Sequence, residues 1–241
     1  MNDSVLQEAA EREIALHRSE KIIRFAADGA IYWIKRRRSN GRNRLVKYSP
    51  AIEFQSEVAR ITIAAAVLPE LVPQIVVLTP SYMVTKDTGE SIEDWLDEED
   101  VSGEDKEHML YEVGRGLARL HNAGIAHGRP APRDITWQDG RVTFLDWENR
   151  LYFKRIERQR VQDFLLLFQG IYRRYFPEEQ RWAAALERGY ASEDKSGTRE
   201  RAVAFLRKRG YLRAIMDKLT RFHMHDVEAV AKVYAHFLHN R

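Results

Sequence analysis

The sequence predicts an α+β fold in which a small, β-rich N-terminal part precedes a larger, helical C-terminal part. Two Asp-Gly pairs, Asp28-Gly29 and Asp139-Gly140, each lie between short runs of β-branched and aromatic residues. This pattern is a strong short-range signal for a β-hairpin. The second half of the chain carries apolar residues at helical spacing over several long stretches. Such spacing indicates amphipathic helices.

Composition limits the class of protein. The chain has 241 residues, of which 44% are hydrophobic and 31% charged, as in a soluble globular protein of one or two domains. It contains no cysteine, which excludes disulfides and thiolate metal sites. No apolar run approaches the roughly 20 residues that a membrane helix needs. We therefore expect a cytoplasmic protein with no transmembrane segment, and contact with the periphery of an inner membrane is left open.

The N-terminal part is expected to hold two helices and four strands. Asp3 or Ser4 is a suitable helix cap, and Pro50 suits a first helical turn. The expected elements are a helix over Val5–His17, strands over Lys21–Ala26 and Ala30–Lys35, a helix over Ile52–Ala66, and strands over Gln74–Leu78 and Ser81–Thr85.

A basic run follows the second of these strands. Arg36–Lys47 contains six basic residues and no acid, with a net charge of +3 for the whole chain. Such a run is typical of a solvated loop, and it also suits an anionic substrate or membrane surface. It lacks interleaved aromatic residues, so we expect no nucleic-acid partner.

Helices dominate the C-terminal part. Ser91 and Asp94 have the spacing of a helix cap, and Gly114 and Gly116 inside the first long helix indicate a close packing contact, since glycine lowers helix propensity. The expected helices cover Glu104–Asn122, Glu157–Tyr175, Glu178–Tyr190, Arg199–Gly210, Tyr211–Thr220 and Asp226–Leu238, with a polar loop over Ala191–Thr198.

The stretch between the first two of these helices carries the chemistry. A loop over His127–Asp134 leads into the Asp139-Gly140 hairpin, which ends on Asp146-Trp147-Glu148. Asp134 and Asp146 therefore lie at the two ends of one small hairpin. Paired carboxylates in such a place suit a divalent metal held against a phosphate, because Mg²⁺ favours carboxylate and phosphate oxygens.

These motifs resemble those of the protein-kinase-like superfamily, and most closely the small bacterial lipopolysaccharide core kinases that act on Kdo and heptose. Aminoglycoside-type phosphotransferases are a more distant likeness. The family loop reads His-Gly/Arg-Asp-x-x-Pro-x-Asn, followed by a metal motif Asp-Phe-Gly or Asp-Trp/Phe-Glu. His127, Pro132 and Asp146 match this pattern. Asp134 stands where the family has asparagine, and Arg129 stands where it has the catalytic aspartate.

The resemblance implies one kinase-like domain over residues 1–241, with an N-lobe to residue 85 and a helical C-lobe from residue 86. It implies ATP and Mg²⁺ as cofactors. Lys35 would contact the nucleotide phosphates, with Glu57, or its rival Glu53 one turn earlier, orienting the lysine. Backbone groups of Met83, Val84 and Thr85 would contact adenine.

The same resemblance implies that Asp134 and Asp146 bind the metal. No glycine-rich phosphate loop is visible, so the phosphate-covering hairpin would be short or would be the Asp28-Gly29 turn itself.

Arg129 leaves the reaction open, because an arginine cannot act as a general base. In one alternative Asp134 or Glu148 takes the proton and Arg129 neutralises the transferring phosphoryl group. In a second the protein is a nucleotide-binding pseudokinase or scaffold. In a third the reaction differs, for example nucleotidyl transfer. The acceptor is expected to be a lipopolysaccharide core sugar, hence an anionic lipid-linked sugar, or else a protein, as for a Ser/Thr kinase.

Two further features have competing interpretations. Asp163 resembles a buried acid that braces the catalytic loop in relatives, and it equally fits a helix-surface aspartate. The C-terminal histidines include a His-x-His pattern, but no third ligand stands at a recognised metal-site spacing. We therefore expect surface or packing roles for His223, His225, His236 and His239.

Overall fold

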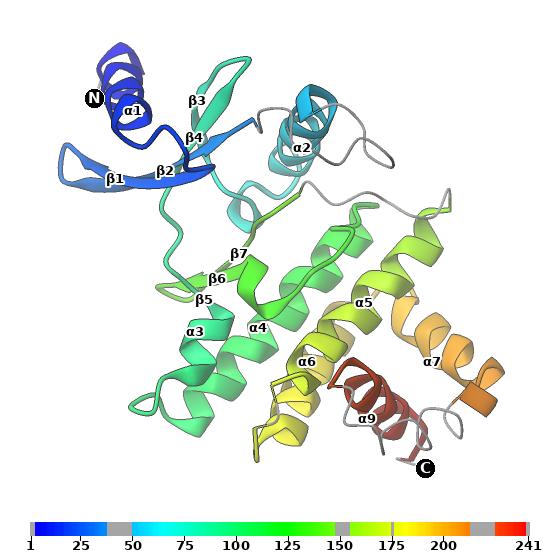
Figure 1. Cartoon of the computed structure of the whole chain (residues 1–241). Helices are drawn as coiled ribbons and strands as arrows, with labels where there is room; N and C mark the ends of the chain where they lie inside the picture. The colour runs from blue at the N-terminus through cyan, green and yellow to red at the C-terminus, as the bar shows by residue number, and fades with distance from the viewer. Residues whose placement is uncertain (1–2, 38–49, 148–154, 175, 213–224, 240–241) are drawn as a thin grey trace. The chain divides into compact units, whose positions relative to one another are not determined.

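The computed structural model describes residues 3–37, 50–147, 155–174, 176–212 and 225–239. The chain divides into two compact units, one formed by residues 1–89 with 146–148 and the other by residues 90–145 with 149–241. Each unit has its own sheet and its own helices (Figure 1). The described residues thus have the mixed α+β character that the sequence predicts.

The first unit is built on a four-stranded antiparallel sheet with the order β1-β2-β4-β3. Asp28 (φ 50°) and Gly29 (φ 72°) are both left-handed, as a two-residue turn with the twist of its strands requires. This confirms the first predicted hairpin. The strands are β1 (Ile22–Ala27), β2 (Ala30–Arg36), β3 (Ile75–Leu78) and β4 (Tyr82–Lys86).

One face of this sheet is covered by α1 (Asp3–Leu16) (Figure 1). Alternate strand residues form a buried apolar cluster with Leu6 and Ala10 of this helix. The strand members of the cluster are Ile23, Phe25, Tyr32, Ile34, Val77, Tyr82 and Val84. Because side chains alternate along a strand, Lys35 and Met83 belong to the opposite face.

The second helix of this unit, α2 (Pro50–Ala65), precedes the short 3₁₀ helix η1 (Pro69–Leu71). It buries Phe54, Glu57, Ile61 and Ala64, and this spacing of three and four residues puts all four on one side of the helix. A buried glutamate in an otherwise apolar stripe needs a partner. That partner defines the candidate site below.

The second unit contains a three-stranded sheet with the order β5-β6-β7. Asp139 (φ 49°) and Gly140 (φ 77°) form the left-handed turn of the second predicted hairpin. The strands are β5 (Glu90–Ser91), β6 (Ile135–Gln138) and β7 (Arg141–Phe144), with η2 (Pro132–Asp134) before β6. The helices are α3 (Ile92–Asp97), α4 (Gly103–Asn122), α5 (Ile156–Tyr172), α6 (Glu179–Glu193), α7 (Thr198–Lys208) and α9 (His225–His239).

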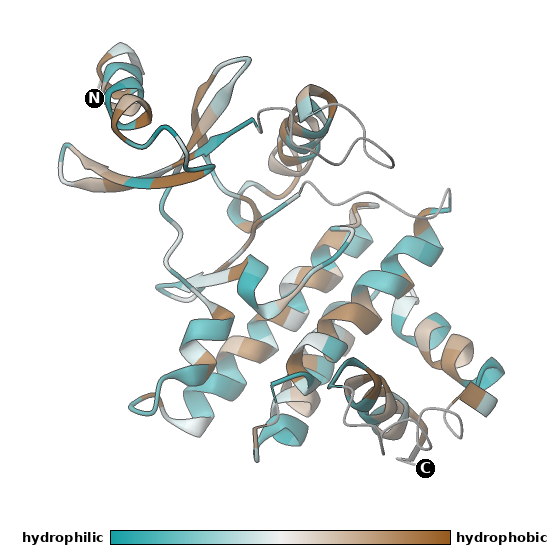
Figure 2. Ribbon diagram, viewed as in Figure 1, coloured by the Kyte–Doolittle hydropathy of each residue, from teal (hydrophilic) through white to brown (hydrophobic). Residues whose placement is uncertain are grey.

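Helices α4 and α6 cross so closely that side chains are excluded at the contact. A Cβ atom at Gly114 would lie 2.2 Å from the Leu186 carbonyl oxygen, and one at Gly189 would lie 1.9 Å from the Tyr111 carbonyl oxygen. The packing contact predicted at Gly114 is thus confirmed. Brown and teal stretches both occur along α4 and α5 in Figure 2, as expected for amphipathic helices.

The predicted polar loop after α6 is wrong in its bounds. Helix α6 continues to Glu193, and α7 already begins at Thr198. The extra turn is held by tertiary contacts, since the Asn122 amide donates to the Glu193 carbonyl oxygen (2.7 Å) and Arg115 forms an ion pair with the Glu193 carboxylate (2.8 Å). Contacts of this kind are not visible in local sequence.

Several expected features lie outside the described residues. These are Glu148, the helix segment after residue 212, the basic run from residue 38 onward, and His223. Among the described helices, none combines the length and apolar character needed to cross a bilayer.

Candidate functional site

The candidate site begins with Lys35 on the sheet face opposite α1. Its Nζ lies 2.5 Å from Glu57 Oε1 and 2.9 Å from Asp146 Oδ1. All three residues belong to the first unit. We call them the lysine–carboxylate cluster. Glu57, rather than its rival Glu53, is therefore the glutamate that pairs with Lys35.

The three side chains differ in exposure. Glu57 is 3% exposed, Lys35 15% and Asp146 34%. Burial by itself would lower the pKa of the Lys35 ammonium group, but the charges and hydrogen bonds of Glu57 and Asp146 outweigh it and raise the pKa above its ordinary value. Lys35 therefore carries its charge at neutral pH. Asp146 is the member of the cluster with room for a further ligand.

The backbone of Asp146 is strained. Its φ of 58° lies in the left-handed region, which is costly for a residue with a side chain and persists only where the surroundings impose it. Here α2 supplies the constraint. The Arg60 guanidinium donates to the Trp147 carbonyl oxygen (2.6 Å) and lies over the buried Trp147 ring, 5.5 Å from its centroid.

Arg60 is thus a positioning residue that sequence reasoning did not single out. It follows Glu57 by three residues, so both project from the same side of α2. One helix face therefore holds Lys35 through Glu57 and the Asp146-Trp147 segment through Arg60.

The loop from residue 127 to 134 lies in the second unit and is braced from beneath by Asp163. This carboxylate is fully buried and accepts hydrogen bonds from the backbone N–H groups of His127 (2.6 Å) and Gly128 (3.0 Å). Gln159 donates to it as well (3.2 Å). The alternative interpretation of Asp163 as a surface residue is wrong, because local sequence could not show what this side of α5 packs against.

The two ends of the loop fix the end of the hairpin. His127 is buried beside Phe144, and its Nε2–H donates to the Leu145 carbonyl oxygen (2.7 Å). The Leu145 N–H in turn donates to the Asp134 carbonyl oxygen (2.7 Å). Gly128 has a φ of 102°, in the region that favours glycine. The loop conformation is therefore set by buried contacts, and Leu145 directly precedes Asp146 in the chain.

The remaining expected site residues are placed as follows. Asp134 is largely buried, and its Oδ1 lies 3.6 Å from the Arg133 Nε. Arg129 is exposed, and no hydrogen bond or ion pair joins it to another described residue. Strand β4 lies between β2 and β3, so the peptide groups of Met83–Thr85 face strand partners on both sides. Their contact with adenine remains a prediction.

Of the C-terminal histidines, His236 has a packing role. Its Nδ1 lies 2.9 Å from the Tyr172 hydroxyl and its Nε2 lies 2.9 Å from Glu187 Oε2. Within the described part of the chain, no group of three or more histidine, aspartate or glutamate side chains is arranged to hold a metal ion.

Comparison with known proteins relates part of the chain to a described family. The model of the lipopolysaccharide kinase (Kdo/WaaP) family matches residues 79–190. An uncharacterised protein of Haemophilus influenzae is 31% identical over 175 residues, which cover 72% of this chain and 71% of that protein. The chain therefore belongs to the protein-kinase-like superfamily. Within that superfamily, its matched family is that of the lipopolysaccharide kinases.

Two weaker similarities carry no argument about function. A probable bifunctional tRNA threonylcarbamoyladenosine biosynthesis protein of Natronomonas pharaonis is 29% identical over 89 residues, or 37% of this chain and 16% of that protein. A solved gentamicin–APH(2")-IIa complex aligns with 97% of this chain and 96% of its own, at 11% identity and a TM-score of 0.48.

Proposed function

We propose that this protein is an ATP- and Mg²⁺-dependent phosphotransferase that phosphorylates a sugar hydroxyl of a lipopolysaccharide core. The observation that carries the proposal is the lysine–carboxylate cluster. A strand lysine paired with a helix glutamate, beside an aspartate that opens an Asp-Trp-Glu motif, is the arrangement with which kinase-like enzymes hold nucleotide phosphates. The lipopolysaccharide kinase match of residues 79–190 supports the acceptor class.

The donor groups fit a magnesium nucleotide. Asp146 offers a partly exposed carboxylate, of the kind that Mg²⁺ prefers, and Lys35 offers a charged ammonium group. When bound, ATP supplies the phosphoryl group and Mg²⁺ neutralises its charge. In our proposal Lys35 positions the phosphates, Glu57 holds Lys35, and Asp146 and Asp134 supply metal ligands.

The adenine contacts are assigned around the end of β4. Met83 pairs with Lys35 across the ladder and shares its face of the sheet. The peptide groups of Met83, Val84 and Thr85 are directed at neighbouring strands, so we assign the backbone contacts to the residues that follow Lys86, where the chain leaves the sheet. Met83 and Thr85 would contribute their side chains.

The acceptor proton needs a base other than Arg129. We assign it to Asp134 in the braced loop, through the carboxylate oxygen that does not bind the metal. The acceptor oxygen would form a bond to the γ-phosphorus of ATP, and its proton would pass to Asp134. The bond from that phosphorus to the bridging oxygen would break, and ADP would leave with the electron pair. General-base catalysis contributes about 10²–10⁴-fold, so Asp134→Asn should slow turnover by at least that lower factor and leave nucleotide binding weakened but detectable.

A second candidate function is nucleotide binding without transfer. It is favoured by one observation, Arg129 in the place of the catalytic aspartate. The two candidates share the lysine–carboxylate cluster and differ in turnover.

The test is a thermal-shift titration with ATP and Mg²⁺ run beside an assay of ATP turnover. Binding at 100 times Kd stabilises a protein by about 2.7 kcal/mol, a visible shift. The shift should be lost in Lys35→Met and reduced in Asp146→Asn, and it should persist in Lys208→Met, an exposed lysine on α7. No shift at millimolar ATP would overturn both candidates.

The class of acceptor is tested by measuring which molecule incorporates labelled phosphate from ATP. Incorporation into purified lipopolysaccharide, absent with Lys35→Met, supports the sugar kinase. Incorporation only into protein would point to a Ser/Thr kinase, and a nucleotide-dependent shift without any transfer would support the pseudokinase.

A further inference from the structure

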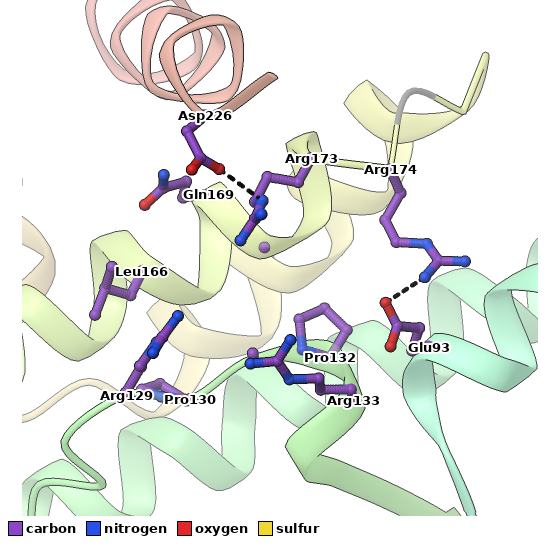
Figure 3. A pocket seen from close by; sticks show the side chains of 12 residues that line it. Glu93, Arg129, Pro130, Pro132, Arg133, Leu166, Gln169, Arg173, Arg174 and Asp226 are labelled. Atoms are coloured by element: carbon purple, nitrogen blue, oxygen red, sulfur yellow. Dashed lines mark hydrogen bonds and ion pairs between the residues drawn. The ribbon is translucent and has the colours of Figure 1, made fainter. Parts of the chain in front are cut away.

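A cavity of about 500 Å³ lies in the second unit, between the braced loop and helix α5 (Figure 3). The loop contributes residues 129–133, and α3 and α9 each contribute one acid. Helix α5 and its end contribute Leu166, Gln169, Gly170, Arg173 and Arg174. Four arginines line it, namely Arg129, Arg133, Arg173 and Arg174. We call it the arginine pocket. The proposed roles of Lys35, Glu57 and Asp146 do not involve it.

The charges of the arginine pocket are only partly balanced. Arg173 Nε lies 2.9 Å from Asp226 Oδ1, and Arg174 forms ion pairs with Glu93 and Asp97. Arg129 has no carboxylate partner among the described residues, and Arg133 reaches only Asp134, at 3.6 Å. Among the residues that line the pocket, four arginines stand against two acids, so the lining has an excess of positive charge, concentrated on its loop side.

The guanidinium groups converge. In Figure 3, Arg129 and Arg133 rise from the loop toward α5, and the guanidinium of Arg173 turns down toward the same space. Scattered surface arginines would each extend into water to separate their like charges. Three that face one concave space are the pattern expected of an anion site.

The wall that carries Arg129 and Arg133 is rigid. Pro132 packs against Gly170 of α5 so closely that a Cβ atom at position 170 would lie 2.6 Å from its Cδ. The preceding residues His127 and Gly128 are held by buried Asp163. Both arginines therefore extend from a loop whose backbone is fixed on two sides, which lowers the entropic cost of binding a ligand.

The chemistry of the guanidinium group limits the class of ligand that the pocket can bind. A guanidinium group offers a planar fork of N–H donors that binds phosphate or carboxylate oxygens in pairs. Arg129 has no carboxylate partner among the described residues, and the partner of Arg133, Asp134, lies 3.6 Å away. Together these two arginines match the double negative charge of a phosphate monoester better than the single charge of a carboxylate. The cavity volume lies within the range of about 300–1,000 Å³ found for small-molecule sites, so it holds more than a bare phosphate ion.

We propose that the arginine pocket binds a phosphate monoester group of the acceptor, with Arg129 and Arg133 as its main donors. The role in acceptor binding rests on the proposed kinase function, whereas phosphate binding itself does not. In this arrangement Arg129 is an acceptor-binding residue, which accounts for a cation in that loop position.

The experiment is an NMR titration of the Lys35→Met variant with inorganic phosphate, following the arginine Nε–Hε resonances at constant ionic strength. Lys35→Met removes the ammonium of the nucleotide site, so phosphate bound there does not contribute. We expect saturable shifts of the Arg129 and Arg133 resonances in the millimolar range, and at least tenfold weaker binding in an Arg129→Ala/Arg133→Ala double variant. Arg181→Ala, an exposed arginine of α6 paired with Glu107, is the matched control and should leave binding unchanged.

Several outcomes overturn the proposal. They are equal, unsaturated shifts of all arginine resonances, unchanged binding in the double variant, and acetate binding as tight as phosphate. Both arginines are exposed, so the variants should fold, and an unchanged melting temperature verifies this. With active protein, the double variant should raise the acceptor KM at least tenfold and leave the KM for ATP unchanged. Saturable phosphate binding in a protein that never binds ATP would uphold the pocket and refute the kinase.

Discussion

Two buried carboxylates, one in each unit, stabilise the protein in different ways. Glu57 in the first unit is satisfied by another charge, the Lys35 ammonium at 2.5 Å. Asp163 in the second unit is satisfied by the peptide N–H groups of His127 and Gly128 and by a glutamine amide. Charge pairing fixes the position of a functional side chain, whereas peptide pairing fixes the path of a loop.

The difference explains which groups remain available for ligands. In the lysine–carboxylate cluster the charges largely neutralise one another, and Asp146 keeps the greatest exposure. In the braced loop, buried Asp163 accepts hydrogen bonds from backbone N–H groups, whereas the side chains of Arg129 and Arg133 are exposed to solvent. The first arrangement suits a metal-bound polyanion, and the second suits an anion bound directly.

The largest effect is expected when the charge pair loses its cation. Lys35→Met should lower kcat by at least about 100-fold, as removal of one hydrogen-bond donor to a developing negative charge does in other enzymes. Steady-state ATP turnover measures it, with Lys208→Met as control. An activity within fivefold of the unaltered protein would remove Lys35 from the site.

The next effect concerns the peptide-paired acid. Asp163→Ala leaves two buried N–H groups without acceptors, and it should lower the free energy of unfolding by about 3 kcal/mol. Urea unfolding measures the loss. Arg158→Ala, an exposed position on the same helix, should change it by less than about 0.5 kcal/mol. Equal effects at the two positions would contradict the brace.

Glu57→Gln tests the charge-paired acid. Breaking a fully buried ion pair costs about 3–5 kcal/mol, but Lys35 keeps Asp146 as a partner, so we expect about 2 kcal/mol. Glu53→Gln, one turn earlier, should cost less than about 1 kcal/mol. The same urea experiment compares them, and a larger loss at Glu53 would refute the assignment of Glu57.

Asp194, which lies just before α7, also has a carboxylate that accepts hydrogen bonds from peptide N–H groups, but it lies near the surface. Its substitution should therefore have the smallest effect. Burial alone would raise the pKa of its carboxyl, but the N–H groups of Arg199, Thr198 and Ser196, with the Ser196 hydroxyl, hold the pKa below its ordinary value. A depressed pKa adds stability above about pH 4 that is lost as the pH falls through the folded-state value.

Asp194→Asn should therefore destabilise the protein by about 1 kcal/mol at pH 7 and by progressively less below about pH 4. Urea unfolding at several pH values measures this. If the loss in free energy of unfolding stayed constant from pH 7 to pH 2.5, the negative charge of Asp194 would not be the source of its stabilising effect.

Much of the fold could be predicted from local sequence. Asp-Gly turns need left-handed φ values at both positions, and both predicted hairpins form with such values at Asp28-Gly29 and Asp139-Gly140. Most helices in the described residues lie within a few residues of their predicted bounds, because apolar spacing and caps are local properties. The end of α6 at Glu193 was missed, because contacts with Asn122 and Arg115 of α4 hold its last turn.

The candidate site divides in the same way. The sequence alone determined the residue types and order of the loop, the Asp-Trp-Glu motif and the strand lysine, since these are patterns along the chain. Tertiary contacts were needed to distinguish Glu57 from Glu53 and a brace from a surface role for Asp163. They were also needed to show that Arg60 holds Trp147. The tertiary structure also gathered Arg129, Arg133 and Arg173 around one cavity. Each of these features depends on which helix faces are buried against partners far away in sequence. Local sequence does not show which distant elements pack together.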